Sequence, residues 1–381
     1  MKLIGSIFYN NPDTYPPIVN SSRLLASAGY SVELWCRENG EHWNVAWPQG
    51  VRVRRIGAPG TSSWREYSAF VRATLGMDCK AARVFIGHDA HGFLPVRILA
   101  AKYRRPLVYH CHDFADRELP LPLGSRGVVL FEQLFARTAD VVIVPDGERA
   151  AVVKRALGLR RDPLVVANAP LNCPVKQTGA LRSALTARSL NWERIVLRQG
   201  MIGAGHGIEA TIRSIPLWTN HNWGFVAIGP GQPDYVAHLN AVARSLQVES
   251  QFAVLPAVGY DDLLSYTLDA DVGHALYDPI HINNRYITTA SNKLMEYIAA
   301  GKPVLVSNRP GLSEFVAQYR CGVTADESSP ESIAGAVNGL LLNREQSLRL
   351  GKAGREAFEQ VFCYERQFSP VVEALSELAA N

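Results

Sequence analysis

The segment SNKLMEYIAAGKPVLVSN, residues 291–308, places a lysine and a glutamate three positions apart in a short predicted helix. Apolar residues around them recur at helical spacing, and a Gly-Lys-Pro turn leads into an apolar strand. Lys293 and Glu296 therefore lie about one helical turn apart and can share one face. We take this pair as the first candidate for binding chemistry. The alternative is that Glu296 is a solvated helix residue.

Four histidines gather near the ends of two predicted strands, in GHDAH (87–91) and YHCHDF (109–114). Together with neighbouring aspartates they suggest a metal site, because imidazole is a common zinc ligand. Sheet geometry alone, however, projects His110 and His112 to the same face of one strand. We therefore expect no bound metal here.

The composition indicates a globular protein of two ordinary domains. The chain has 381 residues, of which 47% are hydrophobic and 19% charged, and its net charge of +4 is too small for a typical nucleic-acid binder. Its six cysteines form no CxxC pair, so neither a zinc knuckle nor a redox motif is present. No apolar run approaches the roughly 18 residues of a membrane span, and the start, MKLIGSIFYNNPD, reaches Asn-Asn-Pro too early for a signal peptide. We expect a soluble, reduced, cytoplasmic protein.

Strands and helices alternate along the chain, which predicts βαβ units and a parallel sheet. The predicted strands include 2–8, 31–36, 83–89 and 106–113, and the helices include 16–30 and 93–103. An Ala-Asp-Val joint occurs in both 138–144 and 269–276, and Pro-led strands recur in 104–110 and 301–307. This weak internal repeat predicts two Rossmann-like domains.

A cluster of Pro, Asn and Gly in NAPLNCPVKQTGA (168–180) marks the domain boundary. We predict an N-terminal domain over 1–172 and a C-terminal domain over 173–361. The last segment, 362–381, is predicted to be a helix that crosses back to the first domain.

In this order, the pieces resemble retaining glycosyltransferases of the GT-B fold. That family depends on nucleotide sugars and includes many bacterial mannosyl-, glucosyl- and N-acetylglucosaminyltransferases. The strongest likeness is residues 291–308, which resemble the family's donor-site helix, and supporting stretches are 131–148, 165–170, 205–212 and 226–231. The resemblance covers nearly the whole chain. It implies an α/β fold of two Rossmann-like domains whose parallel sheets face across a cleft, with acceptor bound N-terminally and donor C-terminally.

The resemblance also implies roles for single residues. Glu296 would accept hydrogen bonds from the ribose hydroxyls of a nucleotide, since a carboxylate can accept two donors. The amides around Ser291 and Asn292 would face the diphosphate at the N-terminus of the helix. Gly203 would permit close backbone approach to a phosphate, and Gly229, in VAIGPG, would belong to the same donor site.

One departure from the family pattern concerns a carboxylate. The family often carries two glutamates eight residues apart, but the position eight before Glu296 is Thr288. A side-chain hydroxyl or amide would then have to contact the hydroxyls of the donor sugar in place of that glutamate. The candidates are Thr288, Asn283 and Asn284.

A second departure concerns the cations that hold the diphosphate. Many relatives have an arginine and a lysine in the first loop of the C-terminal domain, where this chain has Met201 and His206. The leaving group gains negative charge during transfer and must be stabilised. Lys293 is our first candidate for this role, and Arg285, Arg198 and a protonated His206 are the alternatives.

The resemblance assigns His112 to the donor sugar or acceptor, and we predict it as catalytic together with Lys293. Residues 269–271, Asp-Ala-Asp, match the Asp-x-Asp pattern of metal-dependent glycosyltransferases of another fold. They occupy a helix-to-strand joint, so we expect them to be structural. GT-B relatives generally need no metal, and we expect no cofactor other than the donor substrate, a UDP- or GDP-sugar.

The predicted function is metal-independent transfer of a sugar to a hydroxyl acceptor with retention of configuration. The missing glutamate and cations leave open a nucleotide-sugar epimerase, a nucleotide-sugar-binding protein or a pseudo-glycosyltransferase. The basic stretches 96–105 and 154–161 leave open a weak peripheral contact with membrane, although a solvated face is the simpler explanation.

Overall fold

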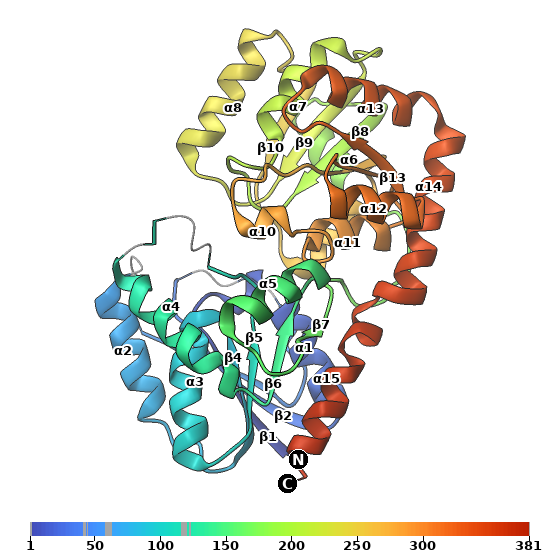
Figure 1. Ribbon diagram of the computed structural model, residues 1–381. Coiled ribbons are helices and arrows are strands. Elements are labelled where there is room, and N and C mark those ends of the chain that lie inside the picture. Colours follow the sequence, from blue (N-terminus) through green and yellow to red (C-terminus); the bar gives the residue numbers. More distant parts are fainter. Residues whose placement is uncertain are drawn as a thin grey trace. The chain divides into compact units, whose positions relative to one another are not determined.

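The computed structural model describes residues 2–40, 43, 45–57, 63–115, 120–121 and 123–380. The chain forms two compact units, one comprising Met1–Asn168 with Tyr364–Asn381 and the other Ala169–Cys363. Each unit contains one parallel sheet with helices on both faces (Figure 1). The predicted α/β class with two Rossmann-like domains is thus confirmed. Within the described ranges, none of the helices is long and apolar enough to cross a membrane.

The first unit is built on a seven-stranded sheet in the order β3-β2-β1-β4-β5-β6-β7, with every neighbouring pair parallel. Its strands are β1 (Lys2–Phe8), β2 (Tyr30–Arg37), β3 (Val51–Ile56), β4 (Ala82–His88), β5 (Leu107–His110), β6 (Val141–Val144) and β7 (Leu164–Val165). The strand order reverses between β1 and β4. In open α/β sheets such a reversal opens a crevice beyond the carboxyl ends of the strands.

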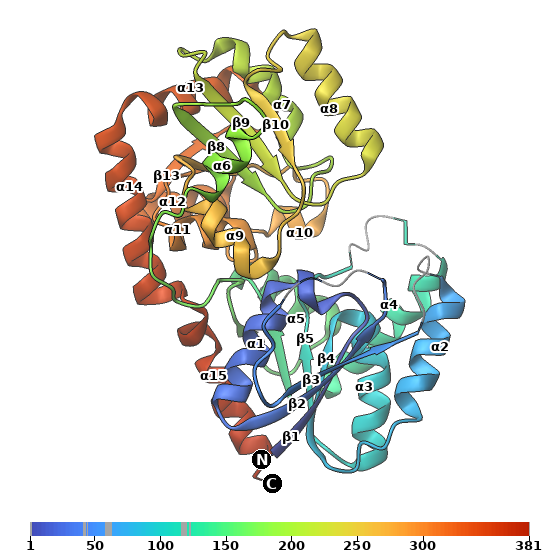
Figure 2. The same cartoon turned by 180° about the vertical axis from the view of Figure 1, so that it is seen from behind.

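Helices cover both faces of this sheet. The second, third and fourth helices pack side by side on one face, and the first and last helices pack together on the other (Figures 1 and 2). The helices of the unit are α1 (Pro16–Ser27), α2 (Trp64–Leu75), α3 (Asp89–Tyr103), α4 (Leu123–Phe135), α5 (Gly147–Leu157) and α15 (Tyr364–Leu378), with 3₁₀ turns η1 (Pro12–Thr14) and η2 (Ala136–Thr138). The C-terminal helix is anchored by Tyr364, whose hydroxyl donates to the carbonyl of Pro17 (3.3 Å).

The second unit repeats the plan with a six-stranded parallel sheet in the order β10-β9-β8-β11-β12-β13. Its strands are β8 (Arg194–Gln199), β9 (Trp223–Ile228), β10 (Phe252–Leu255), β11 (Val272–Ala275), β12 (Val304–Ser307) and β13 (Gly322–Ala325). Here the order reverses between β8 and β11, so the crevice of this sheet is expected beyond their carboxyl ends.

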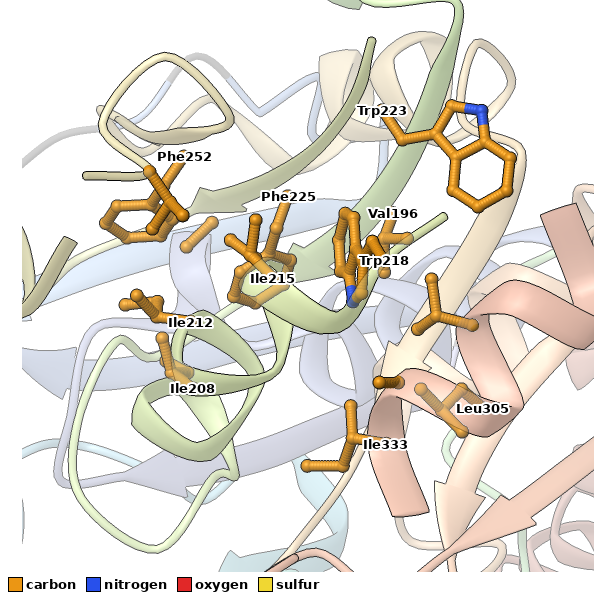
Figure 3. Packing of buried hydrophobic residues seen from close by; sticks show 14 of the residues in the cluster. Val196, Ile208, Ile212, Ile215, Trp218, Trp223, Phe225, Phe252, Leu305 and Ile333 are labelled. Atoms are coloured by element: carbon orange, nitrogen blue, oxygen red, sulfur yellow. The ribbon is translucent and has the colours of Figure 1, made fainter. Parts of the chain in front are cut away.

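A hydrophobic core of the second unit lies between its sheet and the helices α7, α8 and α13. Figure 3 shows Ile208, Ile212 and Ile215 side by side against Phe225 and other strand residues. The helices of this unit are α6 (Ala180–Thr186), α7 (Ile208–Ser214), η3 (Ile215–Leu217), α8 (Pro233–Ser245), α9 (Tyr260–Thr267), α10 (Ile282–Arg285), α11 (Asn292–Ala299), α12 (Pro310–Tyr319), α13 (Pro330–Leu342), α14 (Arg344–Ala357) and the π-helical turn η4 (Phe358–Phe362). Burying such side chains contributes about 1.5–3 kcal/mol each, which fixes the strands that carry the site.

The Ala-Asp-Val joint has the same structure in both units. The Asp271 carboxylate accepts the amide of Ile195 (2.9 Å) while its own amide donates to the Ile195 carbonyl (2.9 Å). Asp140 makes the same pair of bonds to Leu107 (both 2.8 Å). The carboxylate of Asp269 accepts two backbone amides at the beginning of α6, each at 3.0 Å. The structural role predicted for the Asp-Ala-Asp pattern is therefore confirmed.

Candidate donor site

The predicted donor residues lie on three segments at the carboxyl edge of the second sheet. The amide of Gly200, just after β8, donates to the carbonyl of Ile228 at the end of β9 (2.9 Å). Gly229 has a φ of 150°, and a Cβ there would lie 2.1 Å from the carbonyl oxygen of Gly200. From α11, the Cε of Lys293 lies 3.6 Å from where a Cβ of Gly200 would be. Glycine at position 229 thus allows the two loops to meet, and glycine at position 200 allows its φ of 90°.

Glu296 is buried against the end of β8. Only 7% of the residue is exposed, and its Oε2 accepts a hydrogen bond from Nε2 of Gln199 (2.5 Å). Gln199 is held in turn by Thr267, whose hydroxyl donates to its Oε1 (2.9 Å). Burial raises the pKa of Glu296 to about 7, against a smaller lowering by the Gln199 bond. Glu296 is therefore not a solvated helix residue, and its role toward ribose stays a prediction.

Lys293 lies on the same helix and contacts the same loop. Its Nζ donates to the hydroxyl of Tyr277 (2.8 Å) and lies 4.7 Å from the centre of that ring. Among the described residues it forms no ion pair with a carboxylate. Through α11, Glu296 thus contacts Gln199 and Lys293 contacts the next residue, Gly200. The ammonium group of Lys293 has no counter-charge among the described residues.

A second cation, Arg198, lies beneath this loop. Arg198 has no exposed surface, and its guanidinium donates to the carbonyls of Gln199 (2.9 Å) and Met201 (3.3 Å). Its Nε has no hydrogen-bond partner, and no ion pair joins it to a carboxylate in the described ranges. Burial lowers its pKa. A buried cation without a counter-charge is costly, and an anion bound at the loop would offset that cost.

The N-terminus of α11 is capped by Ser291. Its Oγ accepts the amide of Leu294 (3.2 Å) and shares a hydrogen bond with the Tyr277 hydroxyl (2.5 Å). The amide of Ser291 itself donates to the carbonyl of Thr288 (3.4 Å), a residue that is buried. The first-turn amides of a helix have no intrahelical acceptor. An anion at this end would therefore meet the amides of Asn292 and the next residue more directly than that of Ser291.

The predicted loop residues differ in charge and exposure. His206 is half-buried, and burial, followed by the charges of Arg198 and His281, lowers its pKa to about 3. Without a bound anion it is therefore neutral near pH 7. Met201 is 58% exposed. Gly203 is half-buried, and no heavy atom lies closer than 3.9 Å to where its Cβ would be, so packing does not require a glycine there.

His112 lies in the first unit, two residues beyond the end of β5. It is 1% exposed, and its Nε2 lies 3.0 Å from Nδ1 of His88. The carbonyl of His112 accepts from Arg149 (2.6 Å), and its amide donates to Asp89 (2.8 Å), which also accepts the amide of Asp113 (3.0 Å). Burial, then the charge of Asp113, raises the pKa of Asp89 to about 8. Asp89 has a φ of 52°, a strained backbone of the kind often found at functional sites.

Sequence reasoning missed Gln199, Tyr277 and Thr267, which position the two helix residues. Gln199 is the last residue of β8, and Tyr277 stands two residues beyond β11. Polar side chains at the carboxyl ends of the two strands that flank the switch point were the available signal.

Comparison with known proteins agrees with this architecture. A family model described as "Glycosyl transferase 4-like domain" matches residues 18–169, and one described as "Glycosyl transferases group 1" matches residues 191–357. Among solved structures, similar folds include sucrose-phosphate synthase from Thermosynechococcus elongatus (TM-score 0.76, 16% identity, 100% of both chains). Another is Anabaena HepE in complex with UDP-glucose (TM-score 0.75, 15% identity, 99% of this chain and 100% of that one). The chain has the GT-B fold and belongs to the glycosyltransferases.

Two curated relatives match part of the sequence. An uncharacterized glycosyltransferase of Methanocaldococcus jannaschii is 30% identical over 152 residues, which is 39% of this chain and 36% of the relative. The GDP-mannose-dependent α-(1-6)-phosphatidylinositol monomannoside mannosyltransferase of Mycobacterium tuberculosis is 26% identical over 150 residues, 39% of each protein. The match thus spans less than two fifths of either relative.

Proposed function

We propose that this protein transfers a sugar from a nucleoside diphosphate to a hydroxyl acceptor, with retention of configuration and without a catalytic metal ion. One observation carries the proposal. At the switch point of the second sheet, a buried carboxylate, Glu296, and two cations that have no carboxylate partner among the described residues, Lys293 and Arg198, all contact the segment Gln199–Met201. A nucleoside diphosphate supplies the hydroxyls and the negative charge that this arrangement lacks.

In the proposed complex the carboxylate of Glu296 accepts hydrogen bonds from the ribose hydroxyls. Lys293 and the first-turn amides of α11 face the diphosphate, and Arg198 adds positive potential from beneath the loop. The charge on the leaving phosphate grows as the glycosidic bond breaks, so these groups stabilise the transition state more than the ground state. The leaving phosphate oxygen can accept the proton of the acceptor hydroxyl on the same face, which gives retention without a carboxylate nucleophile.

The relatives support more than one donor. One similar structure holds UDP-glucose, whereas one curated relative is named as GDP-mannose-dependent. We therefore propose a UDP- or GDP-hexose as donor. The role of His112 toward the sugar or acceptor stays part of the same proposal.

The test is a donor panel. UDP-, GDP- and ADP-sugars are incubated with the protein and simple hydroxyl acceptors, and the product is followed by NMR, which reports the anomeric configuration. The same assay is run with EDTA. Transfer that survives EDTA and retains configuration supports the proposal, whereas inversion or rescue of an EDTA-treated sample by magnesium or manganese contradicts it. Epimerised donor without transfer identifies an epimerase, and binding without turnover identifies a binding protein.

A further inference from the structure

Three buried histidines converge at the carboxyl ends of β4 and β5 in the first unit. His88 ends β4, His110 ends β5 and His112 follows two residues later, and their exposed fractions are 4%, 2% and 1%. One ring nitrogen of each lies within 4.8 Å of those of the other two. Strand geometry alone accounts for the proximity of His110 and His112. It accounts for His88 as well, because the parallel β4–β5 ladder pairs His88 directly with His110, so the sheet itself holds the three rings together.

The nitrogens of this cluster have fewer hydrogen-bond partners than they need. Nδ1 of His88 and Nε2 of His112 lie 3.0 Å apart, so either one ring donates its N–H to the other or both nitrogens bind one ion. Within the described chain, Nε2 of His110 and Nδ1 of His112 have no hydrogen-bond partner at all.

We propose that His88, His110 and His112 form a zinc-binding site, with a fourth coordination position open to water or another small ligand. Three neutral imidazoles are a donor set that zinc prefers. This proposal replaces our expectation from the sequence that these histidines bind no metal.

The surroundings of His88 fit the proposal. Oγ of Ser6 lies 2.9 Å from Nε2 of His88, so the ring can bind the ion through Nδ1 while its Nε2–H donates to Ser6. Metal-binding histidines are commonly held by such a hydrogen bond from the other nitrogen. No proton has to leave, because each neutral ring keeps its hydrogen on the nitrogen that faces away from the ion. A cavity of about 10 Å³ borders Ser6, His88 and His110, which leaves these rings room to adjust.

The ion has a consequence for the transfer reaction, which rests on the proposed function. A zinc ion in this cluster occupies His112 and removes it from any contact with the sugar or acceptor. Zinc should therefore inhibit transfer. Binding of the ion does not depend on that activity.

The test uses Co²⁺ as a spectroscopic probe for Zn²⁺ in the full-length protein. After treatment with a chelator, the protein is titrated with Co²⁺, and we expect one equivalent to give the visible absorption of a low-coordinate cobalt site, which Zn²⁺ then abolishes. His110→Asn should lose this absorption. His221→Asn, which changes an exposed histidine of the second unit, should keep it. Absorption that is absent from the parent, or equal in the parent and His110→Asn, overturns the proposal.

A second variant covers the case in which His110→Asn does not fold. Ser6→Ala keeps all three histidines but removes the hydrogen bond to His88, and zinc affinity should fall by roughly 10- to 100-fold. An unchanged affinity contradicts the arrangement. In the transfer assay, zinc should inhibit the parent more strongly than Ser6→Ala. If no sugar is transferred at all, the cobalt titration still decides the metal site, so the two proposals fail separately.

Discussion

At the scale of single residues, Glu296 has a charge that changes near neutral pH. Burial raises its pKa from 4.5 to about 7, so the folded protein holds a proton that the unfolded chain releases in this range. Without ligand, the contribution of Glu296 to the free energy of unfolding therefore falls as the pH rises from 4.5 to about 7. Donors that hydrogen-bond to the carboxylate favour its ionised form.

This gives a prediction for nucleotide binding. The affinity for nucleoside diphosphate should rise as the pH increases through about 7 and then level off, because only the ionised carboxylate makes charge-assisted bonds to ribose. Glu296→Gln should lose this pH dependence and, at high pH, bind about ten- to 150-fold more weakly, which corresponds to about 1.5–3 kcal/mol. Calorimetry across the pH range measures both. An unchanged affinity in Glu296→Gln argues against a ribose contact.

Lys293 should matter for turnover more than for binding. Removing its charge in Lys293→Ala withdraws stabilisation that grows with the charge on the leaving phosphate, so turnover should fall by roughly tenfold to a thousandfold, with a smaller loss of donor affinity. Lys352→Ala, at an exposed lysine of α14, is the control and should match the parent. Single-turnover rates decide the question. If Lys293→Ala turns over at the rate of the parent, the cation that stabilises the leaving phosphate must be Arg198 or Arg285.

Arg198 should act on the phosphates and not on the nucleoside. Arg198→Met keeps much of the side-chain volume but removes the buried charge, so affinity for nucleoside diphosphate should fall by at least about tenfold while affinity for the free nucleoside changes little. Arg198→Lys, which restores a cation, should recover part of the loss. Equal losses for both ligands would mean that Arg198 only supports the carbonyls of Gln199 and Met201.

At the scale of elements, the site depends on two loops that touch through glycines. A Cβ at position 229 would collide with the carbonyl of Gly200, and its φ of 150° disfavours any other residue. Gly229→Ala should therefore lower the free energy of unfolding by about 1–3 kcal/mol and weaken nucleotide binding. Gly335→Ala, inside α13 with no atom within 4 Å of its Cβ position, should instead stabilise by up to about 1 kcal/mol. Urea denaturation compares the two. Similar effects of both changes would show that the loop contact is not tight.

Local patterns predicted elements well and contacts poorly. The repeated Ala-Asp-Val segments correctly predicted two similar sheets, because in both units the aspartate carboxylate accepts a backbone hydrogen bond at the start of a strand. Strand β3, VRVRRI, was not predicted. The partner of Glu296, Gln199, lies 97 positions away along the chain, and periodicity contains no information on such a pair. Nor does the sequence show that burial keeps His206 neutral, since that depends on the folded loop.

At the scale of the whole molecule, the two units differ in how the chain builds them. The second unit is one continuous stretch, Ala169–Cys363, whereas the first needs both ends of the chain. All the described contacts of Glu296, Lys293 and Arg198 lie inside the second unit. This unit also has its own six-stranded sheet and its own core.

We therefore predict that residues 169–363, expressed alone, fold and bind nucleoside diphosphate with an affinity within about tenfold of the whole chain. The physical reason is that the proposed contacts to ribose and diphosphate need no residue of the first unit. A tenfold margin allows residues outside the fragment to contribute about 1.4 kcal/mol to the binding free energy. Circular dichroism establishes folding, and calorimetry measures the affinity of the fragment and of its Glu296→Gln variant. The variant should bind more weakly by the same factor as in the whole chain. A folded fragment that does not bind, while the whole chain does, would show that residues of the first unit make the dominant contacts with the nucleotide.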